Sequence, residues 1–451
     1  MIYKVCKQKK KGDNMQVITK KDKKSKINKK SNNSRRKNAM LYPIYKIFAW
    51  DLLSYYSIEY LFLTITKGVT PSQVLVISAV YVISKVILQI PAVIISEYLG
   101  KRKSIIVGNF FVFIYTILLM LSPNMFGICI AEFVCALGYD IKAICDSNLL
   151  YDSVATKGGD GLYTKLEQKG GSGYYVLDAA LSIMAGYLFV INNYIPMIIC
   201  SVCLVISLII SFKFKDIYTV KKENRKSVGK FIKEYKTDIF SSLKFIKRSK
   251  RIKSYILFGV VFFGVIRILD TYKSELLTSS GIEAEQFSII IAVLSLIAAI
   301  SVGFAKNIQN KFKNRTLSFI SLTYLISWVA IGVICLTTTK NIALPLVLML
   351  YVVNRICDSQ WYITRGKYLR NFTEPESRDK ITFIFELITS LAAGLSALIG
   401  AAILDSTDIK HAILLVALGG LALMILVLDY MRTRFGLKPK QYNDEDIKFV
   451  E

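Results

Sequence analysis

The chain has 451 residues, of which 53% are hydrophobic, and a formal net charge of +27 at pH 7. It contains about twelve apolar runs close to the roughly 20 residues that a helix needs to cross a bilayer. Lipid offers no partner to unpaired backbone groups, so such runs must be helical. This composition excludes a soluble globular protein and predicts an all-α, polytopic membrane protein.

The positive charge is concentrated in two stretches of the chain. Residues 1–40 hold fifteen Lys or Arg against Asp13 and Asp22, and residues 213–253 hold fifteen against four acidic residues. Residues 1–40 also lack apolar periodicity, which is typical of a disordered tail. Basic segments beside a membrane are attracted to anionic lipid, so we expect a lipid partner for both stretches and no nucleic acid. Whether residues 1–39 are translated stays open, because Met40 directly precedes the first apolar run.

Twelve transmembrane helices are predicted in chain order. Their ranges are about 41–64, 72–97, 104–121, 126–151, 172–191, 194–214, 254–277, 284–305, 316–338, 342–364, 380–404 and 411–432. A basic linker at 215–253 divides them into an N-terminal six-helix bundle at 41–214 and a C-terminal six-helix bundle at 254–433. A second tail follows at 434–451.

The distribution of Lys and Arg over the loops predicts the orientation. Short loops rich in these residues stay on the cytoplasmic side of a membrane. The connections at 101–103, 306–315 and 365–380 are basic, whereas Ser122–Met125 and Asn192–Asn193 carry no Lys or Arg. We therefore predict a multi-pass protein of the cell membrane with both termini in the cytoplasm.

The linker contains a predicted amphipathic helix. Its apolar residues recur at spacings of three or four, with lysines among them. These apolar residues are Ile232, Tyr235, Ile239, Leu243 and Ile246. We expect the helix to lie on the cytoplasmic membrane surface, and docking of a partner protein is the alternative.

The loop Pro91–Lys103 carries a recognisable motif. It resembles the loop between helices 2 and 3 of the major facilitator superfamily, Gly-x-x-x-Asp-Arg-x-Gly-Arg-Arg-Lys. The residues that match its slots are Glu97, Gly100, Lys101, Arg102 and Lys103, whereas Val93 and Tyr98 depart from it. The resemblance implies a gating loop at Glu97, Gly100, Lys101 and Arg102.

Two further stretches support the resemblance. Ser147–Ser153 is similar to the end of helix 4 in a group of bacterial permeases of that superfamily, and Gly303–Arg315 echoes Pro91–Lys103 in the second half of the chain. The resemblance implies twelve helices in two pseudo-symmetric bundles.

Ionisable residues inside the apolar runs are the candidate site. A charge within a membrane is expensive and usually faces a cavity or a partner. Most of them lie on spans one, four, seven and ten, which the resemblance implies line a central cavity. We assign to the substrate and proton pathway Asp51, Tyr55, Glu59, Lys85, Glu132, Asp140, Lys142, Asp146, Arg267, Asp270, Arg355, Asp358 and Glu386.

Helical spacing suggests how these residues are arranged. Asp51, Tyr55 and Glu59 are four apart and would share one face of a helix. Lys142 with Asp146, Arg267 with Asp270, and Arg355 with Asp358 could pair within their own helices, and such pairs could simply neutralise each other. Lys85 could be the partner of Asp51.

These residues predict a secondary active transporter. Acids outnumber bases among them, which favours a cationic or amphipathic substrate over an anion. We hypothesise that one or two of Asp51, Glu59, Asp140 and Glu386 exchange protons during export by alternating access. Uptake of a nutrient, or a transporter-like receptor without turnover, remains an alternative.

Signatures of other classes are missing from the sequence. There is no G-x-x-x-x-G-K-[ST] stretch for a nucleotide and no nucleophile–base pair, and the single His411 cannot build a His-based metal site. We therefore expect a protein that is not an enzyme and needs no cofactor or metal. We also expect a monomer.

Overall fold

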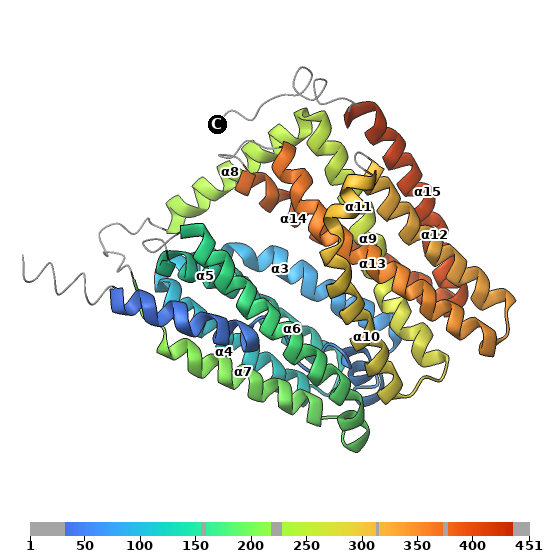
Figure 1. The fold of residues 1–451 in the computed structure, drawn as a ribbon, viewed down its shortest axis with the longest axis horizontal. Helices are drawn as coiled ribbons and strands as arrows, with labels where there is room; N and C mark the ends of the chain where they lie inside the picture. The colour runs from blue at the N-terminus through green and yellow to red at the C-terminus, as the bar shows by residue number, and fades with distance from the viewer. Residues whose placement is uncertain (1–31, 155–158, 218–227, 313–314, 373–377, 436–451) are drawn as a thin grey trace, which may run out of the picture.

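The computed structural model describes residues 32–154, 159–217, 228–312, 315–372 and 378–435, and this part of the chain is helical without strands (Figure 1). The helices are 32–49, α2 (Glu59–Leu61), the π-helix η1 (Phe62–Thr66), α3 (Pro71–Leu99), α4 (Lys101–Leu121), α5 (Met125–Val154), α6 (Gly159–Ile191), α7 (Ile195–Lys213), α8 (Val228–Arg248), α9 (Lys250–Ser279), α10 (Ala284–Gly303), α11 (Ala305–Phe312), α12 (Thr316–Thr337), α13 (Lys340–Phe372), α14 (Arg378–Ser406) and α15 (Ile409–Phe435). The predicted all-α membrane fold is confirmed.

Ten helices within these ranges are long and apolar enough to cross a membrane. The predicted spans one and four are not among these ten helices, and each has a physical reason. Span one is broken between residue 49 and Glu59, and α5 carries several charges, among them Asp140, Lys142 and Asp146. Counting both spans gives the predicted twelve.

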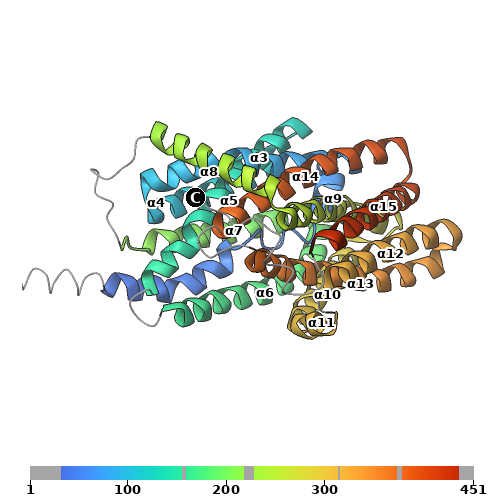
Figure 2. The same ribbon diagram turned by 90° about the horizontal axis from the view of Figure 1, so that it is seen from above.

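The helices form two bundles that meet mainly along two pairs of helices. Helices 32–49 to α7 make the N-terminal bundle and α9 to α15 the C-terminal bundle (Figure 1). Between them, α3 packs against α14, and α6 packs against α10. The helix α8 connects the bundles and packs against α9, α14 and α3 (Figure 2).

The linker helix agrees in part with its prediction. In α8, Phe245 and Ile246 are buried, while Lys244 and Lys247 are exposed. The side chains of Ile232 and Tyr235 lie outside the described residues. A position on a lipid surface stays a prediction.

The start of the first helix differs from the predicted tail boundary. Residues 32–40 are helical and so belong to the bundle, while residues 1–31 lie outside the described part. Asn38 explains the attachment, because its amide Nδ2 donates to the Lys215 carbonyl at 2.8 Å and its Oδ1 accepts from the Lys215 N–H at 2.9 Å. This pair joins the first helix to the end of the N-terminal bundle.

The hairpin between α3 and α4 is fixed by Gly100. This residue has φ +80°, a left-handed conformation that favours glycine, and it both ends α3 and precedes α4. Lys101 then pairs with Asp152 at 2.5 Å, and Arg102 donates to the Phe212 carbonyl at 3.0 Å. The end of the molecule that holds these residues is called the basic end below.

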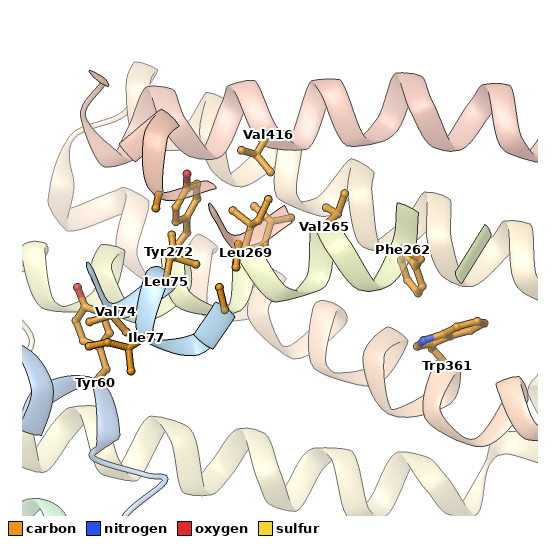
Figure 3. Packing of buried hydrophobic residues seen from close by; sticks show 14 of the residues in the cluster. Tyr60, Val74, Leu75, Ile77, Phe262, Val265, Leu269, Tyr272, Trp361 and Val416 are labelled. Atoms are coloured by element: carbon orange, nitrogen blue, oxygen red, sulfur yellow. The ribbon is translucent and has the colours of Figure 1, made fainter. Parts of the chain in front are cut away.

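The core of the C-terminal bundle is aromatic. Trp361 is fully buried and packs edge-on against Phe262, with ring centroids 5.5 Å apart (Figure 3). Phe258 stands 5.2 Å from the same indole. Such rings bury large apolar areas in a fixed geometry, which stabilises α9 against α13.

At the opposite end the two bundles touch directly. The Tyr60 hydroxyl donates to the Glu275 carboxylate. A Cβ placed on Gly186 of α6 would lie 2.1 Å from Ser288 Oγ and 2.6 Å from the Ala284 carbonyl of α10. An added methyl group would force these helices to shift apart, so Gly186 lets the bundles close against each other at this end.

Candidate functional site

A cavity of about 350 Å³ lies between the two bundles, next to the closed end. Its walls come from span one, α3, α4, α5 and α6 on one side and from α9, α10 and α13 on the other. Its volume falls within the range of pockets that hold small-molecule ligands, about 300–1,000 Å³.

Five of the predicted pathway residues line this cavity. They are Glu59, Glu132, Arg267, Asp270 and Arg355. They come from spans one, four, seven and ten, as the sequence analysis expects, although spans two, three, five and eight line the cavity as well.

The N-terminal wall is acidic. Glu132 of α5 is 5% exposed and accepts a hydrogen bond from the Tyr115 hydroxyl at 3.0 Å. Glu59 lies at the start of α2, where the chain regains helical structure. Asp178 of α6 also lines the cavity, and the sequence analysis does not assign it. A signal existed, because this carboxylate stands in an apolar run with no Lys or Arg three or four residues away.

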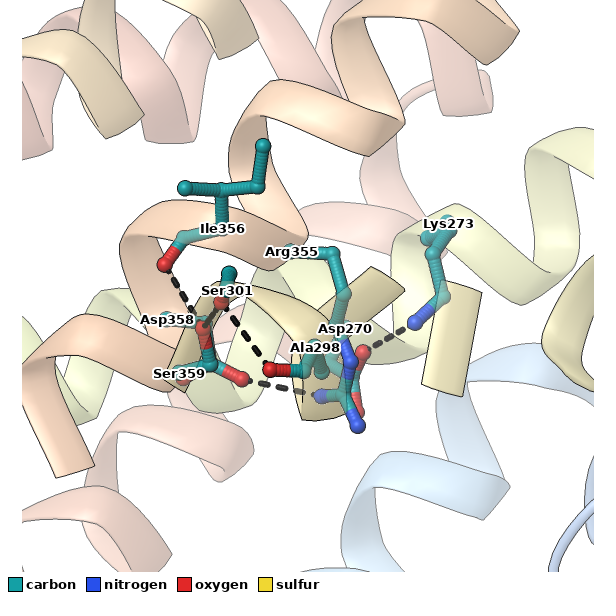
Figure 4. Close-up of polar contacts among 8 residues, drawn as sticks. All are labelled: Asp270, Lys273, Ala298, Ser301, Arg355, Ile356, Asp358 and Ser359. Carbon is teal, nitrogen blue, oxygen red and sulfur yellow. Dashed lines mark hydrogen bonds and ion pairs between the residues drawn. The ribbon is translucent and has the colours of Figure 1, made fainter. Parts of the chain in front are cut away.

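The C-terminal wall is basic, with one acid. On α9, Asp270 pairs with Lys273, and on α13 Arg355 donates to Asp358 at 3.0 Å (Figure 4). The predicted pairing of Arg355 with Asp358 therefore agrees with the structure. The predicted pairing of Arg267 with Asp270 is not observed. The carboxylate of Asp270 pairs instead with Lys273, one turn further along α9. The sequence analysis does not assign Lys273 to the pathway.

Asp51 lies beside the cavity, at the break in span one. Its Oδ1 accepts from the Tyr139 hydroxyl at 3.0 Å and from the Leu52 N–H at 3.1 Å. A side chain that bonds the neighbouring backbone competes with helix formation, and Ser54 follows with φ +68°. Span one is therefore not a continuous helix, so the helical face predicted for Asp51, Tyr55 and Glu59 is wrong.

Lys142 is positioned by the same break. It is 3% exposed, and its ammonium donates to the Ala49 carbonyl, the last in the first helix. A cation at a helix C-terminus is stabilised by the free carbonyls and by the helix dipole. Lys142 therefore caps the broken helix. The predicted pairing of Lys142 with Asp146 is not observed.

Asp146 belongs to a polar network away from the cavity. Its two carboxylate oxygens lie 3.0 and 3.1 Å from the Tyr45 hydroxyl, which accepts from Asn109 Nδ2 at 3.0 Å. Ser207 extends this network to α7 by donating to Asn109 Oδ1 at 3.3 Å. These bonds join four helices, so Asp146 acts in packing.

The remaining predicted residues do not line the cavity. Lys85 is not the partner of Asp51: its ammonium lies 5.7 Å from the Tyr81 ring centroid. Tyr55 and Asp140 are buried, each with a side-chain oxygen that lacks a hydrogen-bond partner in the described residues. The side chain of Glu386 is 57% exposed and faces Arg365 at 4.0 Å.

The predicted gating loop divides into two parts. Gly100, Lys101 and Arg102 hold the basic end of the N-terminal bundle through the turn and contacts described above. Glu97 is exposed on the last turn of α3.

Comparison with known proteins places the chain in a family. The sequence profile of the Major Facilitator Superfamily matches residues 47–353. No match is found among curated proteins.

Solved structures resemble the chain in fold at low sequence identity. One is the nucleoside transporter NupG, at 12% identity and TM-score 0.68, covering 89% of this chain and 99% of that one. A POT family transporter in complex with 5-aminolevulinic acid has 12% identity and TM-score 0.65, covering 88% and 96%. A bacterial homologue of the human lysosomal transporter Spinster, inward-facing and unoccupied, has 12% identity and TM-score 0.60, covering 89% and 94%. Sequence profile and fold agree, and the chain belongs to the Major Facilitator Superfamily, a family of multi-pass membrane transporters.

Proposed function

We propose that this protein moves a small solute across the cell membrane by alternating access. The cavity between the bundles carries this proposal, because it is enclosed at one end by Tyr60, Glu275 and Gly186. Rocking of one bundle against the other would open that end and close the basic end. We place the basic end and both termini in the cytoplasm, on the loop charges, and take the working unit to be a monomer.

We further propose that the solute is cationic or amphipathic and that protons drive its export. The acidic wall supports this part, because Glu59, Glu132 and Asp178 face the cavity from three different segments. A carboxylate at this position can hold a proton or a cationic group in turn, which would couple the two movements.

The experiment is transport by the full chain in liposomes under an imposed pH gradient, with an amphipathic cationic dye as solute. We expect dye movement against its gradient when protons flow the other way. Glu59→Gln should abolish this coupling, while Asp405→Asn, at an exposed site outside the cavity, should retain it. Dye movement in the direction of proton flow would favour uptake, and coupling that is unchanged in Glu59→Gln would remove Glu59 from the mechanism.

Asp51→Asn tests whether the broken span takes part in coupling. Since Asp51 receives hydrogen bonds from Tyr139 and Leu52, the variant keeps most of the local geometry. A pH-driven rate that matches the parent protein would assign Asp51 to structure alone.

A further inference from the structure

The two walls of the cavity carry opposite charge. The acidic and basic side chains that the N-terminal bundle contributes to the described lining are all acids, namely Glu59, Glu132 and Asp178. The C-terminal bundle contributes three bases and a single acid, Asp270. A solute between the bundles therefore meets a negative surface on one side and a positive surface on the other.

Several of these charges are already satisfied by the protein. Asp270 pairs with Lys273, and Arg355 pairs with Asp358, so these four groups compensate one another. Glu132 accepts a hydrogen bond from the Tyr115 hydroxyl, which satisfies one carboxylate oxygen.

Three charges remain without a partner among the residues that the structure describes. The carboxylates of Glu59 and Asp178 accept no hydrogen bond and make no ion pair there, and neither does the guanidinium of Arg267. The Nε of Arg267 is in addition fully shielded from solvent. Arg267 acts electrostatically on Glu59, Glu132 and Asp270, yet it reaches ion-pair distance with none of these carboxylates.

Glu59, Asp178 and Arg267 are partly buried, and an unpaired charge in such a site is less favourable than one that a group of opposite charge reaches. A ligand with a single positive charge would satisfy the acidic wall and leave Arg267 unpaired. A ligand with a single negative charge would do the reverse. One molecule that carries both charges satisfies both walls at once.

We propose that the solute is a small zwitterion, with its cationic group against Glu59 and Asp178 and its anionic group against Arg267. This inference rests on the proposed transport between the bundles, and it narrows the cationic solute proposed above to one whose cationic group is joined to an anionic group. Aromatic rings such as Tyr56, Tyr81 and Tyr174 complete the lining and provide stacking surface for an apolar part of the ligand.

The test uses three matched probe sets on the full chain in lipid nanodiscs. The first set is the free amino acids, the second their carboxyl amides, and the third their N-acetyl forms, so that one scaffold appears as zwitterion, cation and anion. We expect at least one free amino acid to bind at least about tenfold more tightly than both its blocked forms, because each blocked form leaves one wall unpaired.

Two variants assign each charge to its wall. Arg267→Gln should lower the affinity of that amino acid to that of its amide while leaving amide binding unchanged. Glu59→Gln should lower the affinity of the same free amino acid to the affinity of its N-acetyl form. Lys244→Gln, on the exposed face of α8, is the matched control and should bind like the parent protein.

The outcomes separate this inference from the proposed function. Equal binding of a scaffold and its blocked forms, or no binding by any set, overturns the zwitterion site. Selective binding without movement of the same amino acid into liposomes keeps the site and contradicts transport. Movement of the amides with no preference for zwitterions keeps transport and overturns the site.

Discussion

Among the described residues, the N-terminal bundle buries charged side chains such as Lys142 and Asp146, whereas the buried polar side chains of the C-terminal bundle are neutral and aromatic rings pack around its Trp361. Lys142 caps a broken helix in the first, and Asp146 receives a hydrogen bond from Tyr45. In the second, Trp361 is surrounded by rings such as Phe262, and two ion pairs, Asp270–Lys273 and Arg355–Asp358, stand at the cavity wall. The two halves thus share a topology while relying on different interactions, and substitutions should affect them differently.

Among the substitutions that test this comparison, removal of the Lys142 charge should cause the largest loss of stability. Lys142→Met leaves the Ala49 carbonyl uncapped and nearby carboxylates uncompensated in a buried site. Breaking a buried charged contact costs about 3–5 kcal/mol, so we expect a large drop in melting temperature in detergent. A variant that melts like the parent protein would show that the N-terminal bundle does not depend on this contact.

The loss of a tyrosine hydroxyl should lower stability more in the N-terminal bundle than in the C-terminal bundle. Tyr45→Phe removes the hydroxyl that Asp146 and Asn109 share, for an expected loss of about 1–3 kcal/mol. Tyr351→Phe in the C-terminal bundle removes a buried hydroxyl that lacks a partner in the described residues, so stability should change little. Parallel thermal unfolding of both variants measures the difference, and equal losses would contradict the comparison.

The contact between the bundles can be tested at Gly186. An added methyl group would collide with Ser288 and Ala284, and overpacking of this kind costs about 1–2 kcal/mol at a site that can partly adjust. Gly186→Ala should therefore shift the equilibrium about 5- to 30-fold away from closure at this end. Labelling of a cysteine introduced near this end reports the shift.

Gly419→Ala is the matched control for this substitution. A Cβ at Gly419 meets no atom within 4 Å, so the same chemical change should leave labelling as in the parent protein. Equal labelling of both variants would show that Gly186 does not hold the bundles together.

The smallest effect is expected at Lys101. Its side chain is 41% exposed, and its ion pair with Asp152 is screened by solvent. Lys101→Gln should cost less than about 1 kcal/mol, in contrast to the buried lysine of the same bundle. A melting temperature lowered as far as in Lys142→Met would remove the distinction between buried and exposed lysines.

The sequence predicted the helices well because hydropathy and charge act over whole segments. Twelve spans, the basic linker helix and the concentration of charge on spans one, four, seven and ten follow from such averages. Five of the thirteen assigned pathway residues line the cavity, because a charge inside an apolar run is costly unless it faces a polar space.

The remaining features depend on contacts that spacing along one helix cannot reveal. Asp51 binds its neighbouring N–H and Tyr139 of another helix, which interrupts span one. The Lys142 ammonium donates to the Ala49 carbonyl of span one and does not pair with Asp146, four residues further along its own helix. Asp178 was missed because one carboxylate hardly alters the hydropathy of a long apolar run.

The position of Lys142 has a consequence for the ionic requirements of the fold. The ammonium that caps the break at Ala49 is covalently tethered to the chain, so it cannot exchange with ions in the medium as a bound metal ion does. We therefore expect this interrupted segment to keep its shape when sodium is replaced by potassium or choline.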